Sequence, residues 1–248
     1  VSYKEILKMN QVEFLDFGYV TTSHDIINLI DKSNPQAIIL NVPNNPSGQV
    51  LSKDELETIA GYLFKKKIWL IIDEVYRALA FETYDRVYKP NIIYVGSLSK
   101  SMSIPGLRIG YIVAHKKYLP SFLLREQHRN TGLNVVSELY CEKVTKLAFD
   151  RFTNSAKSLY KTRLDAVVKV LQDNRVEYIL PNSGFYLLIK LRPIYGGDES
   201  LSALILERHG VLVTDGDHYG DSFIDYVRIC LTLSELELVK WVKTIIKN

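Results

Sequence analysis

Short apolar runs alternate with helical patterns along the first half of the chain. Runs at residues 37–42, 68–72 and 92–95 are bounded by turn residues, which is typical of buried parallel strands. Between the first two runs, Ser52 and Glu55 have the spacing of a capping box, and apolar residues then recur at helical spacing. Strands that alternate with helices predict an α/β fold, with a mostly parallel sheet flanked by helices.

The second half of the chain has a different pattern. It contains a long amphipathic helix around residues 160–171, and short strands and helices follow from residue 174 onwards. This order predicts a small C-terminal α+β domain. We therefore expect a large domain over residues 1–150, and a connecting helix with the small domain over residues 151–248. The other predicted elements are helices at 3–9, 23–32, 135–147, 201–208 and from 234 onwards, and strands at 12–17, 109–113, 177–180, 185–191 and 223–231.

Composition indicates an ordinary globular chain of 248 residues. Apolar residues make up 47% and charged residues 24%, and the net charge of +3 is spread along the chain. Three lysines at 65–67 end a helical pattern, so they indicate a solvated helix end rather than a nucleic-acid site. No apolar run approaches the length of a membrane span, and the first residues lack the apolar core of a signal peptide.

The cysteines and the first residue add two expectations. Cys141 and Cys230 fit no metal-binding or redox spacing, so we expect no metal site, and reduced thiols in a cytoplasmic protein. The first residue is valine rather than methionine, so the sequence need not begin where the gene product begins.

Candidate chemistry gathers in residues 96–110, directly after an apolar run. A lysine among neutral residues, here Lys100, becomes a nucleophilic amine when burial lowers its pKa. Ser97, Ser99 and Arg108 supply hydroxyls and a planar fork of donors, which suit a phosphate. An amine beside a phosphate site is what a pyridoxal phosphate enzyme needs. Taken alone, this stretch is equally well explained by a solvated lysine and a surface arginine.

Two further segments place polar side chains at the ends of apolar runs. Asn45 lies in the turn of residues 43–48, where its amide can donate to a ring oxygen, although such a turn alone favours a plain β–α connection. Asp73 ends the next run, and Tyr76 follows it. At this position of an α/β sheet, a carboxylate can hold a pyridine nitrogen protonated, and a hydroxyl can contact the ring oxygen.

Four apolar residues followed by Asp73 and Glu74 also describe a strand of a nucleotide hydrolase. That interpretation requires a GxxxxGK[ST] loop, which the 248 residues lack. It would need the loop to lie upstream of the sequence, so it is the least favoured alternative.

Together, these segments resemble the class I/II, fold-type I aminotransferases that depend on pyridoxal 5'-phosphate. The Asn-Pro-Ser-Gly turn, the Asp-Glu-Val-Tyr strand end and the Ser-Leu-Ser-Lys…Gly-Leu-Arg-Ile-Gly segment occur in the family's order. The resemblance implies that Lys100 forms the Schiff base with the cofactor and that Asp73 pairs with its pyridine nitrogen. It also implies that Asn45 and Tyr76 contact the ring oxygen. The implied phosphate ligands are Ser97, Ser99 and Arg108.

The resemblance extends into the second half of the chain. It implies that Arg228, on a predicted strand, binds the α-carboxylate of the substrate, with Asn45 contributing; from the residues alone, a solvent-facing arginine is a comparable interpretation. Tyr186 is either a substrate neighbour or a core aromatic. His218 stands where many relatives have a Pro-Gly turn, and is either a specificity residue or, more simply, a turn histidine in water.

The resemblance implies transfer of an amino group from an L-amino acid to a 2-oxo acid by a homodimer. The alternatives are a pyridoxal-phosphate-dependent decarboxylase or lyase of the same fold, and an incomplete or inactive cofactor-fold module. The chain resembles only about the last two-thirds of a family member, because the family's glycine- and serine-rich phosphate loop and its ring-stacking aromatic are not found. Gly18 is the only glycine before Gly48. We therefore expect a fragment, a chain completed by a separate polypeptide, or a protein that has lost activity.

Overall fold

The computed structural model describes residues 2–20, 22–82 and 85–247, and the chain forms two compact units. The central unit comprises Thr21–Leu159 and Asn182–Gly184. The carboxyl-terminal unit comprises Val1–Val20, Tyr160–Pro181 and Phe185–Asn248. The first residues therefore group with the end of the chain, whereas the sequence pattern places them with the large domain.

The central unit contains a four-stranded sheet with the order β1-β2-β3-β4. The first three strands are parallel, and β4 is antiparallel to β3. This arrangement confirms the mostly parallel α/β sheet. Leu70, Ile72 and Tyr94 are almost completely buried within it. The strands are β1 (Ala37–Asn41), β2 (Trp69–Asp73), β3 (Ile92–Ser97) and β4 (Gly110–Ala114).

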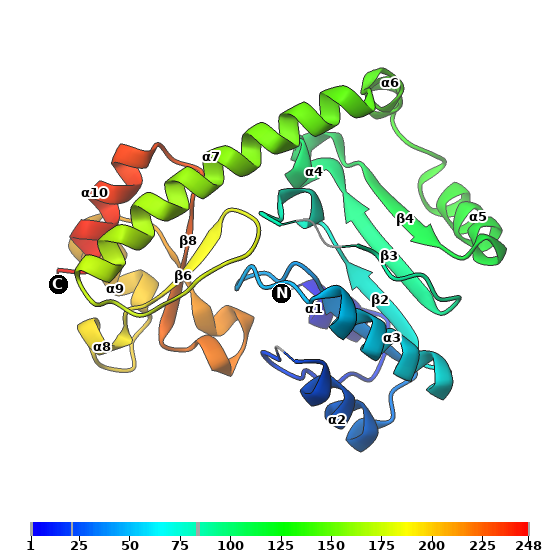
Figure 1. The fold of residues 1–248 in the computed structure, drawn as a ribbon, viewed down its shortest axis with the longest axis horizontal. Coiled ribbons are helices and arrows are strands. Elements are labelled where there is room, and N and C mark those ends of the chain that lie inside the picture. Colours follow the sequence, from blue (N-terminus) through cyan, green and yellow to red (C-terminus); the bar gives the residue numbers. More distant parts are fainter. Residues whose placement is uncertain (1, 21, 83–84, 248) are drawn as a thin grey trace. The chain divides into compact units, whose positions relative to one another are not determined.

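Helix α2 (Ser23–Ser33) precedes β1, helix α3 (Lys53–Lys66) connects β1 to β2, and the two helices lie side by side (Figure 1). The capping box of Ser52 and Glu55 is confirmed at the start of α3, where each side chain bonds to the other's backbone N–H. Thr22 caps α2, where its hydroxyl accepts from the Asp25 N–H at 3.1 Å. The core face of α3 consists of Leu56, Ile59, Ala60 and Leu63.

The remaining helices of the central unit correct one prediction. Residues 135–147 form two helical segments rather than one, because Val144 is extended and the Thr145 hydroxyl accepts a hydrogen bond from the Ala148 N–H at the start of the next helix. No helix in the described part of the chain has both the length and the apolar character needed to cross a membrane. These helices are α4 (Leu98–Ser101), α5 (Leu119–Asn130), α6 (Val135–Lys143) and the first part of α7 (Lys146–Asp173), with short 3-10 turns at Arg77–Leu79, Pro105–Leu107 and Lys116–Tyr118.

The carboxyl-terminal unit is built on an antiparallel sheet with the order β5-β6-β8-β7. Leu187, Ile205 and Val227 are completely buried between this sheet and its helices. An antiparallel sheet with separate helices is an α+β arrangement, as the sequence predicts. Its strands are β5 (Tyr178–Ile179), β6 (Tyr186–Lys190), β7 (Thr214–Asp215) and β8 (Tyr226–Cys230), and its helices are α1 (Ser2–Met9), α8 (Arg192–Tyr195), α9 (Leu201–His209), α10 (Glu235–Ile245) and the end of α7, with 3-10 turns at Gly216–Tyr219 and Asp221–Phe223.

The predicted strand at residues 12–17 is wrong. The segment has no regular secondary structure, and Val12 and Leu15 are exposed. An alternating pattern forms a strand only where another strand can pair with it, and here Asp16 instead forms an ion pair with Lys4 of α1, at 2.6 Å.

Asp215, at the end of β7, holds the start of α9 in place. Its carboxylate accepts hydrogen bonds from the Ser200 hydroxyl at 2.6 Å, and from the backbone N–H and hydroxyl of Ser202 at 2.7 and 2.8 Å. Burial opposes ionisation of this carboxylate, but the hydrogen bonds outweigh burial, and the pKa of Asp215 is lowered from its usual value.

Replacing Asp215 with Asn is expected to lower the free energy of unfolding at pH 7 by about 1–3 kcal/mol, because an amide cannot accept all three hydrogen bonds. The folded pKa of Asp215 lies below its unfolded value. Its contribution is therefore fully present above about pH 4 and is lost as the pH falls through the folded pKa. Urea unfolding should show a smaller difference between variant and wild type near pH 3 than at pH 7.

The exposed Asp198 is a matched control, since Asp198→Asn removes a carboxylate in the same unit. It should leave the free energy of unfolding within about 0.5 kcal/mol of wild type. A difference for Asp215→Asn that is the same at both pH values would contradict the role given to its carboxylate.

Candidate functional site

The carboxyl ends of β1, β2 and β3 lie at one edge of the central sheet, and Asn41 fixes their alignment. Asn41 lies opposite Asp73, which in turn lies opposite Val95. The Asn41 side-chain amide donates to the Asp73 carbonyl at 3.1 Å, and its oxygen accepts from the Asn45 N–H at 2.7 Å. Asn41 therefore ties the turn that carries Asn45 to the strand that ends in Asp73.

The turn that presents Asn45 is fixed by its own hydrogen bonds. The Asn44 side-chain oxygen accepts from the N–H and the hydroxyl of Ser47, at 3.2 and 2.9 Å, and Ser47 is almost completely buried. The backbone of Asn44 also pairs with Gly48 and Gln49. This bonding holds the half-buried Asn45 at the end of β1.

Tyr76 follows β2 and is covered by a segment from far along the chain. The Ser183 hydroxyl donates to the Tyr76 carbonyl at 3.2 Å, and the Gly184 N–H donates to the Leu79 carbonyl at 3.1 Å. Gly184 has φ +81°, and a Cβ there would lie 3.7 Å from the Tyr76 ring. Residues 182–184 therefore form a strap over Tyr76, which is only 5% exposed.

Lys100 is half-buried on α4, a short helix that begins where β3 ends. Ser97 caps this helix: its hydroxyl accepts from the Ser99 N–H at 3.0 Å and donates to the Ile109 carbonyl at 3.0 Å. The Ser101 hydroxyl donates to the Ser97 carbonyl at 3.2 Å. These bonds fix the start of the helical turn that carries the lysine.

Arg108 lies beside the same edge of the sheet, two residues before Gly110, which pairs with Ser97. It is exposed and left-handed, with φ 52°. Its Nη1 donates to the Pro105 carbonyl at 2.9 Å. A guanidinium has five N–H donors, so others remain available for an anion. The buried Ser137 fixes this turn by donating to the Leu107 carbonyl at 2.6 Å.

Behind Asp73, the completely buried carboxylate of Glu74 is neutralised by a cluster of polar side chains. The Arg86 guanidinium donates to both of its oxygens through Nε, at 3.1 and 3.0 Å, and Nη2 also bonds to Oε1. The Tyr111 hydroxyl donates to the same carboxylate at 3.1 Å, and the Arg77 Nε lies 3.7 Å away. These hydrogen bonds raise the pKa of Arg86, while partial burial and the Glu74 charge raise the pKa of Tyr111.

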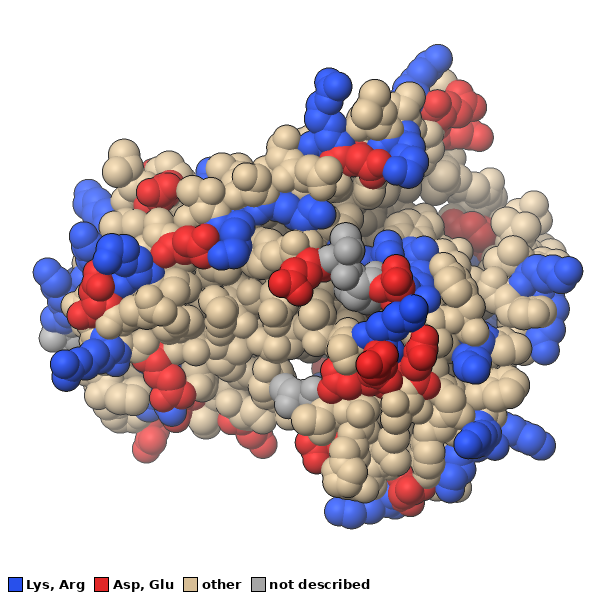
Figure 2. Space-filling view, in the orientation of Figure 1, with Lys and Arg blue, Asp and Glu red and all other residues tan. Residues whose placement is uncertain are grey.

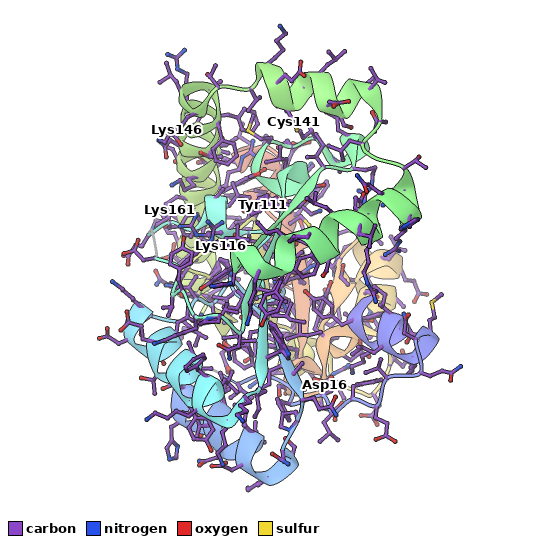
Figure 3. The ribbon with its side chains drawn as sticks, turned by 90° about the vertical axis from the view of Figure 1, so that its right-hand side faces the viewer. Asp16, Tyr111, Lys116, Cys141, Lys146 and Lys161 are labelled. Atoms are coloured by element: carbon purple, nitrogen blue, oxygen red, sulfur yellow. The ribbon has the colours of Figure 1, made fainter. Side chains whose placement is uncertain are left out.

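Gly96 allows Tyr111 to reach this cluster. Tyr111 projects from β4 (Figure 3) and pairs with Gly96 across the strands. A Cβ at residue 96 would lie 2.1 Å from the Tyr111 Cζ, which is far inside van der Waals contact. A glycine is therefore required at residue 96, four residues before Lys100, because the Tyr111 ring lies so close to its backbone.

Arg228 lies on β8 in the carboxyl-terminal unit, opposite Leu188 and Thr214. The Cζ atom of its guanidinium is 3.9 Å from the ring centroid of Tyr186 and 4.9 Å from that of Tyr219. The half-buried Tyr186 ring therefore contacts Arg228 directly.

Three other side chains considered in the sequence analysis, those of His218, Cys141 and Cys230, are exposed. His218 lies in a turn, is 60% exposed and pairs with Asp217 at 3.0 Å, which favours the turn histidine. Cys141 and Cys230 are free and exposed. Over residues 2–20, 22–82 and 85–247, no three His, Cys, Asp or Glu side chains are arranged to hold a metal ion.

Comparison with solved structures identifies the fold. A single mutant of Thermus thermophilus aspartate aminotransferase matches 99% of this chain with a TM-score of 0.89, at 23% identity, and the match covers 66% of that protein. The fold is therefore that of the fold-type I aminotransferases.

Sequence comparison identifies the family. The model of aminotransferase class I and II matches residues 1–245, and the chain belongs to this family. It is 28% identical to a probable N-acetyl-LL-diaminopimelate aminotransferase of Bacillus subtilis, over 86% of this chain and 57% of that protein. It is 27% identical to an aspartate/prephenate aminotransferase of Thermus thermophilus, over 97% of this chain and 64% of that protein. The chain thus spans less than two thirds of these curated relatives.

Gly96→Ala is expected to lower the free energy of unfolding by about 1–3 kcal/mol, because the new methyl group must displace Tyr111 from Glu74. Urea unfolding of Gly96→Ala, Tyr111→Ala and the double variant measures the coupling. If the collision with the Tyr111 ring is the cause, Gly96→Ala should lower the free energy of unfolding much less in the Tyr111→Ala background than in wild type.

Gly61 provides the control, because a Cβ there meets nothing within 4 Å and the residue lies within α3. Gly61→Ala should raise the free energy of unfolding by about 0.5–1 kcal/mol. Equal costs of Gly96→Ala with and without Tyr111 would show that the ring is not the obstacle.

Proposed function

We propose that the protein is a pyridoxal-phosphate-dependent aminotransferase that moves an amino group from an L-amino acid to a 2-oxo acid. The observation that carries the proposal is the shared edge of the central sheet. At this edge Asn45 follows β1, Asp73 ends β2 and the half-buried Lys100 follows β3. The chain belongs to aminotransferase class I and II, which supports a common role for these residues. Ligands of open α/β sheets bind at this edge.

The residues at this edge fit the cofactor. Lys100 offers an amine on a fixed helical turn, and Asp73 ends a strand that Asn41 aligns. One oxygen of the Asp73 carboxylate accepts from the Val75 N–H at 3.1 Å, and we assign this carboxylate to the pyridine nitrogen. When bound, pyridoxal phosphate supplies a reactive aldehyde carbon and a conjugated ring that accepts electrons. We assign Tyr76 and Asn45 to the ring oxygen.

The phosphate is assigned to the serines and the arginine beside the same edge. Arg108 is exposed and has donors beyond the one bonded to the Pro105 carbonyl, and Ser99 lies at the start of α4. The Ser97 hydroxyl donates to the Ile109 carbonyl, so in this proposal it exchanges that acceptor for the phosphate. The N–H groups at a helix start favour negative charge. In this proposal, Lys100 attaches the cofactor and then, as a free amine, moves a proton on the bound substrate.

Arg228 is assigned to the substrate's carboxylate. A guanidinium binds a carboxylate through two parallel hydrogen bonds. The relatives named above are aminotransferases for aspartate, prephenate and N-acetyl-LL-diaminopimelate, which supports a carboxylate-bearing substrate for this chain.

The setting we propose is a cytoplasmic homodimer that acts on small molecules. The free, exposed cysteines support a reducing compartment. Exposed apolar side chains of α5 and α6 support association between copies. On the face shown in Figure 2, basic and acidic side chains are interspersed, which favours small substrates over nucleic acid. The exposed apolar residues include Leu123, Leu124, Val135, Val136 and Leu139.

The first test is to add pyridoxal phosphate to the purified chain, record the absorbance, reduce with borohydride and map the modified peptide. We expect a yellow absorbance band and cofactor fixed on Lys100. Lys100→Ala should lose both the band and any amino transfer, while the exposed Lys65→Ala keeps them. Attachment at another lysine, or normal turnover by Lys100→Ala, would contradict the assignment.

Arg228→Ala should leave the absorbance band intact but raise the KM for the amino donor by roughly 10- to 100-fold, the effect of losing a bidentate charged pair. The measurement is bleaching of the band against donor concentration. Loss of the band itself would show that Arg228 has a structural role instead.

A further inference from the structure

The two tyrosines beside Arg228 reach it from different sides of its strand. In the sheet, β8 lies between β6 and β7. Tyr186 comes from β6, and Tyr219 ends the 3-10 turn that follows β7. Their ring centroids lie 3.9 and 4.9 Å from the guanidinium carbon of Arg228, well within the range of cation–π attraction.

Both tyrosines are themselves held in place. Tyr186 packs on Phe185 at 4.6 Å between ring centroids, and Phe185 packs on Tyr160 of α7 at 5.4 Å. Tyr219 lies on a turn that begins at Gly216, where a Cβ would lie 2.1 Å from the Phe223 carbonyl, so the turn is closed tightly. Tyr186 is thus one of three packed rings, Tyr219 lies on a tightly closed turn, and together the two tyrosines form an aromatic frame around Arg228.

The chemistry of a guanidinium makes this frame selective. All five N–H donors of arginine lie in the plane of the group and point outward from its edge. A ring stacked on a face of the group leaves that edge uncovered. A carboxylate is planar and bonds within that plane, whereas a phosphonate is tetrahedral, and its third oxygen would be directed out of the plane toward a ring.

We propose that Tyr186 and Tyr219 are positioning residues that hold Arg228 edge-on, and that they select a planar carboxylate over a tetrahedral anion at this site. The proposal rests on the proposed function in taking Arg228 as the residue that binds the substrate's carboxylate. It adds Tyr186 and Tyr219 as residues that determine specificity, and it adds tetrahedral anions as a class of ligand that the site rejects.

The titration behaviour of Tyr219 agrees with this role. Burial raises the pKa of Tyr219, and Arg228 only partly offsets the effect. The ring therefore remains neutral at neutral pH, and it contributes through its π face rather than as a counter-ion that would compete with a carboxylate.

The first experiment measures bleaching of the cofactor band against amino donor concentration, with Leu and Phe at each tyrosine. Tyr186→Leu and Tyr219→Leu should raise the KM roughly 3- to 30-fold, the range expected for a lost cation–π contact, with less than about a twofold change in the maximal rate. Tyr186→Phe and Tyr219→Phe keep the ring and should recover most of the affinity.

Arg208→Gln is the matched control. Arg208 lies 5.6 Å from the ring of Tyr195 in the same unit, so the variant removes an arginine–tyrosine contact at another place. It should leave KM and maximal rate unchanged. A fall in maximal rate with unchanged KM in the two Leu variants would overturn the proposal, as would equal KM values for the Leu and Phe variants.

The second experiment needs no cofactor, so it separates this inference from the proposed function. Rings stacked on Arg228 should shift its Nε–H resonance upfield in a proton–nitrogen NMR spectrum, and Tyr219→Leu should reduce that shift. Titration with acetate should perturb this resonance at lower concentration than titration with methylphosphonate, and the preference should shrink in both Leu variants.

The outcomes are distinguishable. If wild type shows no cofactor band but the resonance keeps its ring shift and its preference for acetate, the aminotransferase proposal fails and the frame around Arg228 stands. If the band and its bleaching are normal but the resonance prefers methylphosphonate, or is unaffected by Tyr219→Leu, the frame is overturned and the aminotransferase proposal stands.

Discussion

The buried carboxylate of Glu74 is the constraint on which the edge of the central sheet depends. A charge inside a protein costs several kcal/mol unless charged or polar partners remain beside it. Arg86 must therefore stay within hydrogen-bond distance, and Tyr111 must cross β3 to donate its hydroxyl, which only a residue without a Cβ allows at position 96. Asp73 therefore ends a strand that is held on two sides. The bonds of Glu74 hold it on the side of β3 and β4, and Asn41 ties it to β1.

Local sequence determines much of this fold. The three parallel strands, the capping box of Ser52 and Glu55 and most of the helices follow from periodicity and turn residues within a few positions. Predictions failed where the outcome depends on distant partners. Residues 12–17 alternate like a strand but pair with no strand in the described part of the chain, and β7, with two residues, is too short for any periodicity to reveal. The break after α6 depends on one capping hydroxyl, that of Thr145.

The candidate site divides in the same way. Lys100, Asp73 and Asn45 lie at strand ends within short motifs, so their sharing of one sheet edge could be predicted. The residue that supports them could not be predicted, because Asn41 gains its role from strand register. The same holds in the carboxyl-terminal unit, where Tyr219 lies near Arg228 because β7 flanks β8. Both depend on pairings between strands that are separated in the sequence, and neither residue stands in a recognisable motif.

The strap over Tyr76 determines when the central unit can complete its folding. Ser183 and Tyr76 are 107 positions apart, and the chain between them includes all of α7 and the first strand of the other unit. During synthesis the amino-terminal part emerges first, and closing so long a loop is slow. The turn after β2 therefore stays uncovered until residue 184 has been made. Residues 182–184 belong to the central unit although part of the carboxyl-terminal unit precedes them in the sequence, so a chain that stops at Leu159 lacks the residues that cover Tyr76.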